Sequence, residues 1–137
     1  MNREELSDYG FSIIHLDTTD STNAYAMTHI MDLAHHTVIT ADIQTRGRGR
    51  MERSWISDSP GNLYASIVIK PGMSPGDIPL ANFTQLFSVL ICGVLRGYGT
   101  RARIKWPNDV FINGKKCAGI LSEASFDGGS FKGLVVG

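Results

Sequence analysis

Net charge, cysteine and long apolar runs are all scarce in this sequence, and each scarcity excludes a class of protein. Thirteen Lys and Arg residues match 13 Asp and Glu residues across 137 positions, so the formal net charge is zero. A chain without net charge has no overall field that attracts nucleic acid or an anionic membrane. Any function that needs positive charge must therefore depend on local clusters of basic residues.

The scarcity of cysteine and of apolar runs bears on the compartment. Cys92 and Cys117 are the only cysteines, and both lie in apolar stretches, so we expect reduced thiols that pack as small core residues. No apolar run approaches the roughly 20 residues that span a bilayer. The N-terminus, MNREELSDYG, lacks the basic and then apolar order of a signal peptide. These absences favour a cytoplasmic protein without membrane contact.

Repeats, linkers and low-complexity segments are also missing, which indicates a single domain. Periodicity predicts strands at residues 11–17, 37–43, 61–71 and 101–106. A first helix begins at Asp20 or Ser21, and its predicted apolar stripe is Ala24, Met27, Ile30 and Met31. A second helix, within residues 80–99, is apolar enough to be largely buried. Hairpin turns are predicted at Asn113–Gly114 and at residues 127–130, so the predicted class is α+β, a mixed and mostly antiparallel sheet with helices packed on one side.

The sequence ends on an apolar strand, GLVVG. A domain that stopped inside a core strand would leave an unpaired apolar edge. We therefore expect the domain to be incomplete at its C-terminal end, and the exposed edge favours association with a second copy as a homodimer.

The stretch QTRGRGRMERSW, residues 44–55, holds four of the thirteen basic residues within eight positions. Gly47 and Gly49 allow a ligand to approach the backbone, and guanidinium groups give bidentate hydrogen bonds to phosphate or carboxylate. The pattern is neither GxxxxGK[ST] nor GxGxxG. A small anionic ligand suits these residues, and a flexible RNA-binding arginine and glycine segment is the alternative.

Two further stretches carry candidate ligand groups. In KWPNDV, residues 105–110, Lys105 suits a phosphate, and Asn108 or Asp109 offers the oxygen ligands that magnesium prefers. The same residues also suit a turn whose side chains bond only nearby backbone. In KKCAGIL, Lys116 is either a cation at the mouth of a buried site or an exposed hairpin lysine.

Taken together, four motifs resemble in their order the catalytic domain of biotin-protein ligases. They are DSTN (20–23), Q..GRGR..R.W (44–55), KWPND (105–109) and K.AGIL.E (116–123). The resemblance runs from about residue 11 to the end. It implies one biotin/lipoate ligase-like catalytic domain over residues 1–137, with the class II aminoacyl-tRNA synthetase/biotin ligase-like fold. The implied reaction converts biotin and ATP to biotinyl-5′-AMP, with Mg²⁺, and transfers the biotinyl group to a lysine of a biotin carboxyl carrier protein, from acetyl-CoA carboxylase or a related biotin-dependent carboxylase.

The resemblance also implies a role for each matched residue. The implied catalytic residues are Arg48, Arg50 and Lys116. The implied biotin contacts are Ser21, Thr22, Asn23, Gln44, Gly47, Arg48 and Lys116. The implied nucleotide contacts are Arg50, Arg53, Trp55, Lys105 and Asn108. Asp109 is the candidate magnesium ligand.

Some family features are not matched. Glu52 stands where the family commonly has a glycine. The family's G.GIN-like turn, its small C-terminal barrel and the N-terminal helix-turn-helix of some members are missing from the sequence, so DNA binding is not expected.

Three alternatives remain open from the sequence. The first is a truncated or inactive relative that binds biotin or carrier without turnover. The second is a lipoate-protein ligase, which GRGR together with KWPND resembles less. The third is an RNA-binding module, which the zero net charge and the lack of an aromatic platform disfavour.

Overall fold

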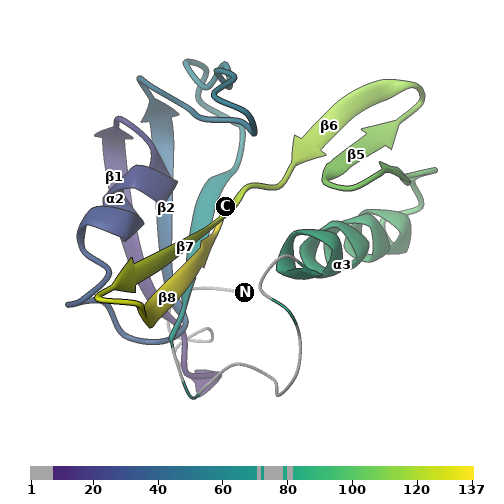
Figure 1. The fold of residues 1–137 in the computed structure, drawn as a ribbon. Helices are drawn as coiled ribbons and strands as arrows, with labels where there is room; N and C mark the ends of the chain where they lie inside the picture. Colours follow the sequence, from purple (N-terminus) through teal and green to yellow (C-terminus); the bar gives the residue numbers. More distant parts are fainter. Residues whose placement is uncertain (1–7, 71, 73–78, 80–81) are drawn as a thin grey trace.

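The computed structural model describes residues 8–70, 72, 79 and 82–137, which form two sheets and two helices (Figure 1). The larger sheet has the order β1-β2-β3-β8-β7, and the smaller has the order β4-β5-β6. The larger contains β1 (Ser12–Thr19), β2 (Thr37–Gln44), β3 (Tyr64–Ile69), β7 (Ser122–Asp127) and β8 (Ser130–Val136). The smaller contains β4 (Arg103–Lys105), β5 (Asp109–Ile112) and β6 (Lys115–Gly119). Only β1 and β2 pair in parallel among the described strands, which confirms a mixed, mostly antiparallel α+β fold.

The last strand, β8, lies inside the larger sheet between β3 and β7. Leu134, Val135 and Val136 are buried there, at 2%, 0% and 3% exposure. The predicted unpaired apolar edge is therefore wrong, because both edges of β8 are hydrogen-bonded. The expectation of a homodimer rested on that unpaired edge, so the structure gives no reason for it.

Helix α2 (Thr22–Thr28) covers one face of the larger sheet. Ala26, with Ile30 just beyond the helix, packs against Val68 and Val135 in a buried cluster. Met31 was predicted to share this apolar stripe, but it is 64% exposed. The helix ends at Thr28, so the helical spacing that placed Met31 on the buried face no longer applies.

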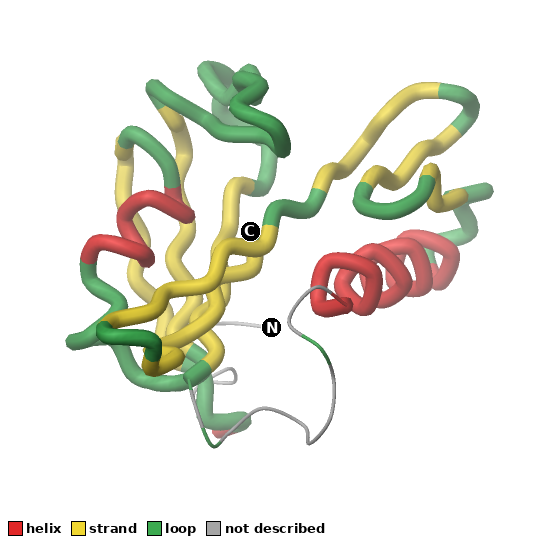
Figure 2. Tube along the Cα trace, viewed as in Figure 1, coloured by secondary structure: helices red, strands yellow, loops and turns green. Residues whose placement is uncertain are grey.

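Helix α3 (Phe83–Gly97) packs against β4 and β5 of the smaller sheet. Phe83 and Cys92 pack with Leu134 and Val136, whereas Val135 packs with the α2 cluster. Successive residues of a strand point to opposite faces, so the two helices lie on opposite sides of β8. Figure 2 shows them apart, with α2 beside β1 and β2 and α3 beside the smaller sheet. The predicted placement of the helices on one side differs from the structure in this respect.

The outer side of α3 is apolar and exposed. Val89, Leu90 and Val94 are 53%, 52% and 61% exposed, so the prediction of a largely buried helix is wrong. Only one side of α3 packs into the core, although the helix sequence carries apolar residues on both sides. None of the described helices combines the length and apolarity needed to cross a membrane.

Two predicted turns and the predicted thiols can be compared with the structure. Asn113 and Gly114 both have positive φ, 51° and 78°, as a two-residue hairpin turn between β5 and β6 requires. Residues 127–130 likewise turn between β7 and β8. Both cysteines are free thiols, but only Cys92 is buried; Cys117 is exposed on β6, so its predicted core position is wrong.

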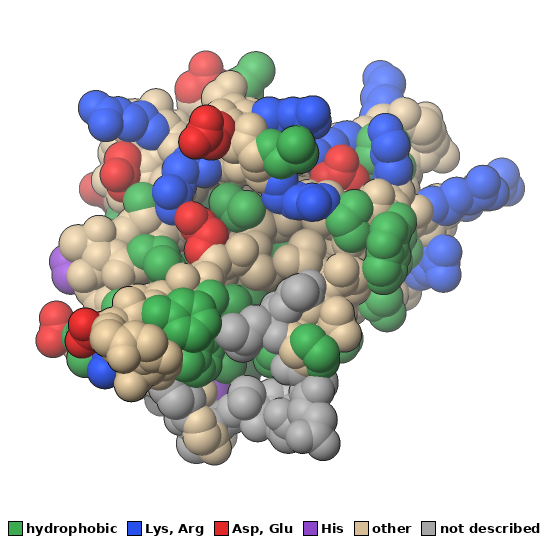
Figure 3. All heavy atoms as spheres, in the orientation of Figure 1, with side chains coloured by type: hydrophobic (Ala, Val, Ile, Leu, Met, Phe, Trp, Pro, Cys, Tyr) green, Lys and Arg blue, Asp and Glu red, His purple; other side chains and the backbone are tan. Residues whose placement is uncertain are grey.

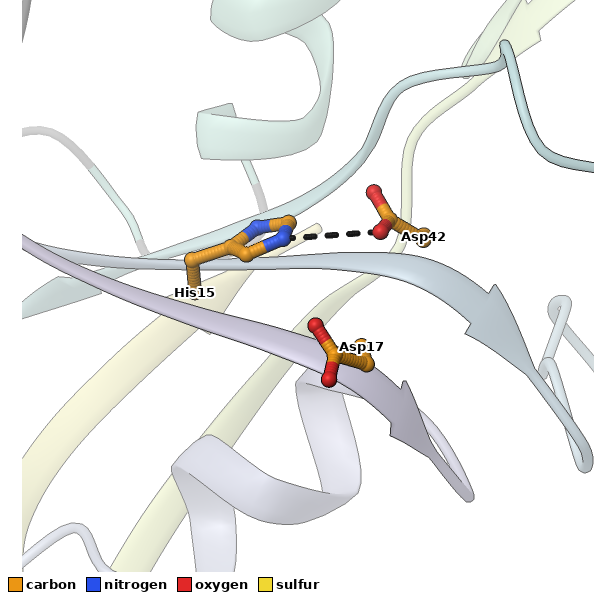
Figure 4. A group of neighbouring side chains, drawn as sticks. All are labelled: His15, Asp17 and Asp42. Atoms are coloured by element: carbon orange, nitrogen blue, oxygen red, sulfur yellow. Dashed lines mark ion pairs between the residues drawn. The ribbon is translucent and has the colours of Figure 1, made fainter.

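Three polar side chains, His15, Asp17 and Asp42, gather on the exposed face of β1 and β2 (Figure 4). His15 Nε2 lies 3.6 Å from Asp42 Oδ2, and Thr40 Oγ1 lies 3.0 Å from His15 Nδ1. An exposed pair of this kind contributes at most about 1 kcal/mol. These residues therefore give the sheet a polar, solvent-exposed face and add little to its stability.

His35 makes stability depend on pH. Its Nδ1 accepts a hydrogen bond from the Lys70 backbone N–H at 3.2 Å, and its ring centroid lies 3.7 Å from that of His36. Burial and, to a smaller extent, His36 lower the pKa of His35 below its usual 6.5. The unfolded chain therefore binds the proton more readily, so the contribution of His35 to stability is constant above pH 6.5 and falls as the pH drops toward its folded-state pKa. His35→Asn keeps an acceptor at this position and is expected to flatten the pH dependence of urea unfolding below pH 6.5. Equal pH dependence in both chains would contradict this assignment.

Candidate functional site

A cleft of about 890 Å³ opens between the larger sheet, the loop after β2 and the smaller sheet. It is lined by most of the residues that the sequence selected: Ser21, Thr22, Asn23, Gln44, Arg48, Arg50, Arg53, Trp55, Asn108, Asp109 and Lys116. Gly47 and Lys105 are the two selected residues that do not line it. Segments far apart in the sequence thus meet in one place.

One wall of the cleft is a buried polar network around Gln44. Its Oε1 accepts hydrogen bonds from the Thr22 backbone N–H at 2.8 Å and from the Thr22 hydroxyl at 3.1 Å. Its Nε2 donates to Ser57 Oγ at 3.0 Å, and Ser57 donates to the Trp55 carbonyl at 2.9 Å. Gln44 and Ser57 are 9% and 2% exposed, so the hydrogen bonds of both side chains are shielded from water. The amide is therefore fixed in orientation by partners on both sides.

The network continues through Ser66 to Asn23. Ser66 Oγ lies 2.6 Å from Asn23 Oδ1 and 2.8 Å from Thr22 Oγ1, and it is 1% exposed. Ser21 is committed differently, because its side chain accepts the Ala24 N–H as the N-cap of α2. Ser66 and Ser57 were not among the residues predicted from the sequence. For Ser66 a signal was present, since it is the one serine within the apolar strand YASIVI.

Residues 47–55 form a short hairpin with defined backbone hydrogen bonds, in place of a flexible arginine and glycine segment. The Trp55 N–H donates to the Gly47 carbonyl at 2.8 Å, and the Gly49 N–H donates to the Arg53 carbonyl at 2.7 Å. The Arg53 N–H closes the turn by donating to the Arg50 carbonyl at 3.3 Å. The hairpin presents its arginines from a defined backbone.

The turn of this hairpin is strained at Met51 and Glu52, where the backbone conformation favours glycine. Met51 and Glu52 have φ of 55° and 59°, which are left-handed values that glycine adopts more easily. Two adjacent residues with positive φ, closed by a bond between the flanking residues, make a type I′ turn, in which glycine is preferred second. The family's glycine thus has a backbone reason, and Glu52 adopts the same conformation at some cost. Its side chain is exposed.

Arg48 is held to the polar wall by Glu123. Arg48 Nη2 donates to Glu123 Oε2 at 2.8 Å, and Asn23 Nδ2 donates to the same oxygen at 2.8 Å. Asn23 Nδ2 also lies 3.2 Å from the Leu121 carbonyl. The carboxylate on β7 therefore joins the hairpin to the start of α2. Glu123 belongs to the quoted motif K.AGIL.E, but the sequence assigned it no role.

Arg50 crosses the cleft to Asn108. Arg50 Nη1 donates to Asn108 Oδ1 at 3.0 Å, and Asn108 Nδ2 donates to the Ile120 carbonyl at 3.1 Å. The Asn108 carbonyl in turn accepts the Ile120 N–H at 2.9 Å. The smaller sheet and the hairpin are thereby linked above the cleft.

Lys116 reaches the cleft between a carboxylate and an aromatic ring. Its Nζ lies 2.7 Å from Asp109 Oδ1 and 4.7 Å from the centroid of the Trp55 ring. Asp109 Oδ1 is buried and accepts no well-directed hydrogen bond, so the ammonium is what compensates its charge. A Cβ at Gly119 would meet the Trp55 ring at 2.9 Å, so a residue without a side chain is needed there. Of the two sequence interpretations of Lys116, the structure matches a cation at the mouth of the site.

The cleft concentrates positive charge. Arg48, Arg50 and Lys116 line it, and Figure 3 shows Lys and Arg side chains gathered over the hairpin and the smaller sheet. Two carboxylates, Glu123 and Asp109, each engage one of these cations. Guanidinium and ammonium groups fixed in this way stabilise an anion that carries carboxylate or phosphate oxygens. The neighbouring polar wall offers amide and hydroxyl groups to an uncharged part of the same ligand.

A magnesium ion does not fit Asp109 as it is arranged here. The Lys116 ammonium already lies 2.7 Å from Asp109 Oδ1, and a divalent cation at the same oxygen would be repelled by that charge.

Lys105 lies apart from the cleft. It is exposed on β4, and its Nζ lies 5.5 Å from the centroid of the Phe111 ring. It is not among the residues that line the cleft, so the geometry gives the predicted nucleotide contact no support.

The chain resembles known proteins over most of its length. The model of the biotin/lipoate A/B protein ligase family matches residues 16–137. The bifunctional ligase/repressor BirA of Bacillus spizizenii is 35% identical over 137 residues, which cover 93% of this chain and 39% of that protein. The biotin–[acetyl-CoA-carboxylase] ligase of Paracoccus denitrificans is 36% identical over 125 residues, covering 89% of this chain and 51% of that protein.

A solved structure shows the same arrangement of elements. The biotin protein ligase from Aquifex aeolicus in complex with biotin and ATP superposes with a TM-score of 0.72 at 31% identity. The match covers 91% of this chain and 50% of that one. The chain therefore spans about half, or less, of the length of these relatives.

Proposed function

This chain belongs to the biotin/lipoate A/B protein ligase family, and on that premise we propose that it activates biotin with ATP and passes the biotinyl group to a carrier protein. The observation that carries the proposal is one cleft that joins a buried polar wall to a cluster of fixed cations. The acceptor is a lysine of a biotin carboxyl carrier domain.

The first step joins two anions, which is why the cations matter. An oxygen of the biotin carboxylate attacks the α-phosphorus of ATP, the bond to the bridging oxygen breaks, and pyrophosphate leaves. Arg48 and Lys116 offset the charge of the carboxylate and the α-phosphate, and Arg50 binds phosphate oxygens. Holding both reactants in one cleft contributes as much as charge does. No protein nucleophile is needed.

In the second step the neutral amine of the acceptor lysine attacks the biotinyl carbonyl. The bond from that carbonyl to the AMP oxygen breaks, AMP leaves, and the amine gives up its proton to solvent. Lys116, held between Asp109 and Trp55, keeps a positive charge near the departing phosphate.

The polar wall favours biotin over lipoate. Thr22, Asn23 and Gln44 present hydroxyl and amide groups that match the N–H and C=O of a ureido ring. The dithiolane ring of lipoate has neither group, so it would displace water from these side chains without offering them a hydrogen bond in return. Ser21 supports this wall by capping α2.

The nucleotide is assigned to the other end of the cleft. Trp55 is the aromatic for the adenine ring, while Arg53 and Asn108 contact the nucleotide and its phosphates. Arg53, Trp55 and Asn108 all line the cleft, which supports this assignment. Lys105 contributes only if the phosphates extend beyond the described lining.

The proposal is tested by mass spectrometry of a biotin carboxyl carrier domain incubated with this chain, biotin and ATP. A gain of one biotinyl group on one lysine is expected, together with release of pyrophosphate before acceptor is added. Lipoate in place of biotin is expected to give little product. Biotin binding without pyrophosphate release would instead identify a relative that binds without turnover.

Glu123 is expected to support catalysis by positioning Arg48 and Asn23. Glu123→Ala removes the acceptor of both hydrogen bonds, so kcat/KM for biotin in pyrophosphate exchange is expected to fall about tenfold. Glu123→Gln keeps one oxygen and is expected to recover part of the loss. A residue with only a structural role would lower the melting temperature of both variants without this rescue in kcat/KM.

A further inference from the structure

A second group of cations lies outside the cleft, on the smaller sheet. Residues 101–119 contain five basic residues and one acidic residue, Asp109, so the segment carries a formal charge of plus four within a chain of zero net charge. The basic residues are Arg101, Arg103, Lys105, Lys115 and Lys116. Such clustering within a chain of zero net charge makes a local positive surface, which suits a partner that carries carboxylates.

The smaller sheet is amphipathic, and its basic face points away from the core. In the β4–β5 pair, Arg103 lies opposite Phe111 and Lys105 opposite Asp109. These residues therefore share one face, because alternate residues of a strand lie on the same side. Ile104, between the two cations, packs instead into the core cluster that includes α3. Asp109 also pairs with Lys116, so the basic face continues to the mouth of the cleft.

The cations on this sheet are available to a partner. Arg101, Arg103, Lys105 and Lys115 are exposed, and none of them makes an ion pair with another of the residues described. Trp106, which follows β4, is 69% exposed beside them. Exposed tryptophan and arginine are the residue types most often found at the energetic centre of protein interfaces.

The proposed reaction gives this face a use. The acceptor must bring a lysine, which is charged in solution, to a cleft that already holds Arg48, Arg50 and Lys116. That approach is repulsive unless carboxylates next to the acceptor lysine meet cations on the enzyme. We propose that the basic face of β4, β5 and β6 docks the acidic residues that flank the acceptor lysine of the partner protein. This inference rests on the proposed function, since it takes a lysine-bearing protein as the second substrate.

The test separates docking from the first chemical step. The variant Arg101→Glu/Arg103→Glu reverses two exposed charges that do not line the cleft. At low ionic strength its KM for the carrier domain is expected to rise roughly tenfold. Its rate of biotinyl-5′-AMP formation without carrier is expected to match that of the unmodified chain. Added salt is expected to raise the KM of the unmodified chain toward that of the variant.

Two controls sharpen the result. Lys132→Glu reverses a charge on β8, outside the smaller sheet, and is expected to leave the carrier KM unchanged. A carrier domain with its flanking carboxylates changed to amides is expected to raise the KM of the unmodified chain, and to have little further effect on the double variant. Non-additivity of this kind is the signature of a direct charge contact.

Three outcomes would overturn the inference. An unchanged carrier KM in the double variant would show that the face does not dock the acceptor. An equal loss of biotinyl-5′-AMP formation would assign the face to the nucleotide. Stronger competition by single-stranded RNA than by free carrier domain would assign it to nucleic acid. An unmodified chain that forms no biotinyl-5′-AMP would instead contradict the proposed function.

Discussion

Arg48→Ala is expected to lower the rate of biotinyl-5′-AMP formation roughly a thousandfold. The guanidinium lines the cleft and is held 2.8 Å from Glu123, so its position does not depend on the substrate. Removing one preorganised charged donor from a site of this kind typically costs two to three orders of magnitude in rate, about 3 to 4 kcal/mol. Pyrophosphate exchange that depends on biotin measures the loss directly.

Arg46→Ala is the matched control for this variant. Arg46 lies in the same loop and is exposed, and it does not line the cleft described above. Its removal changes net charge by the same amount, and nearly full activity is expected. Thermal unfolding of both variants checks that the hairpin persists. Near-normal formation of biotinyl-5′-AMP by Arg48→Ala would contradict the catalytic assignment.

Gly47→Ala is expected to abolish most activity through the backbone rather than through charge. A Cβ on Gly47 would lie well inside 3.0 Å of Ser57 Oγ and of the Trp55 carbonyl oxygen, and 3.2 Å from Gln44 Nε2. The carbonyl is backbone and cannot rotate away, so the hairpin must separate from the wall that orients Gln44. We expect a loss of biotin affinity of about fivefold to a hundredfold, from a cost of about 1 to 3 kcal/mol. Calorimetric titration with biotin measures it.

Gly93→Ala controls for the chemical change itself. Gly93 lies within α3, and an added Cβ would meet nothing within 4 Å. Alanine in a helix is more stable than glycine by about 0.5 to 1 kcal/mol. A small gain in melting temperature with unchanged biotin affinity is therefore expected. If Gly47→Ala behaved in the same way, the close contact inferred for Gly47 would be wrong.

Local signals in the sequence predicted the parts of the fold that depend on neighbours. The Asn113–Gly114 pair specifies its own turn, because both residues adopt positive φ readily. The hydroxyl of Ser21 specifies the start of α2 in the same way. The position of β8 was not predictable from neighbours, since GLVVG suits an edge strand and a central strand equally. Only pairing with β3, more than sixty residues earlier in the sequence, decides between them.

In the candidate site too, local motifs predicted the residues, whereas their contacts depend on the fold. The motifs identified the cleft residues Arg48, Arg50, Asn108 and Lys116, because each motif carries its chemistry within a few positions. Their mutual contacts were not predictable. Asp109 was selected as a metal ligand because of its carboxylate, and only the fold shows that Lys116 occupies that carboxylate. The sequence likewise offered no reason for the family's glycine at the position of Glu52, whereas the φ of 59° at that residue supplies one.

The bond between Asn23 and Glu123 spans 100 positions of the sequence. Contacts of that separation carry a large loop-closure entropy and form late, after helices and hairpins that close over short distances. Thr22 with Gln44 and Ser66, which are 22 and 44 positions apart, close earlier loops of the same network. We therefore expect the polar wall to form in stages during folding, with Glu123, the partner of Arg48, as its last member. On this order the hydroxyl and amide groups of the cleft would be in place before Arg48 is fixed beside them.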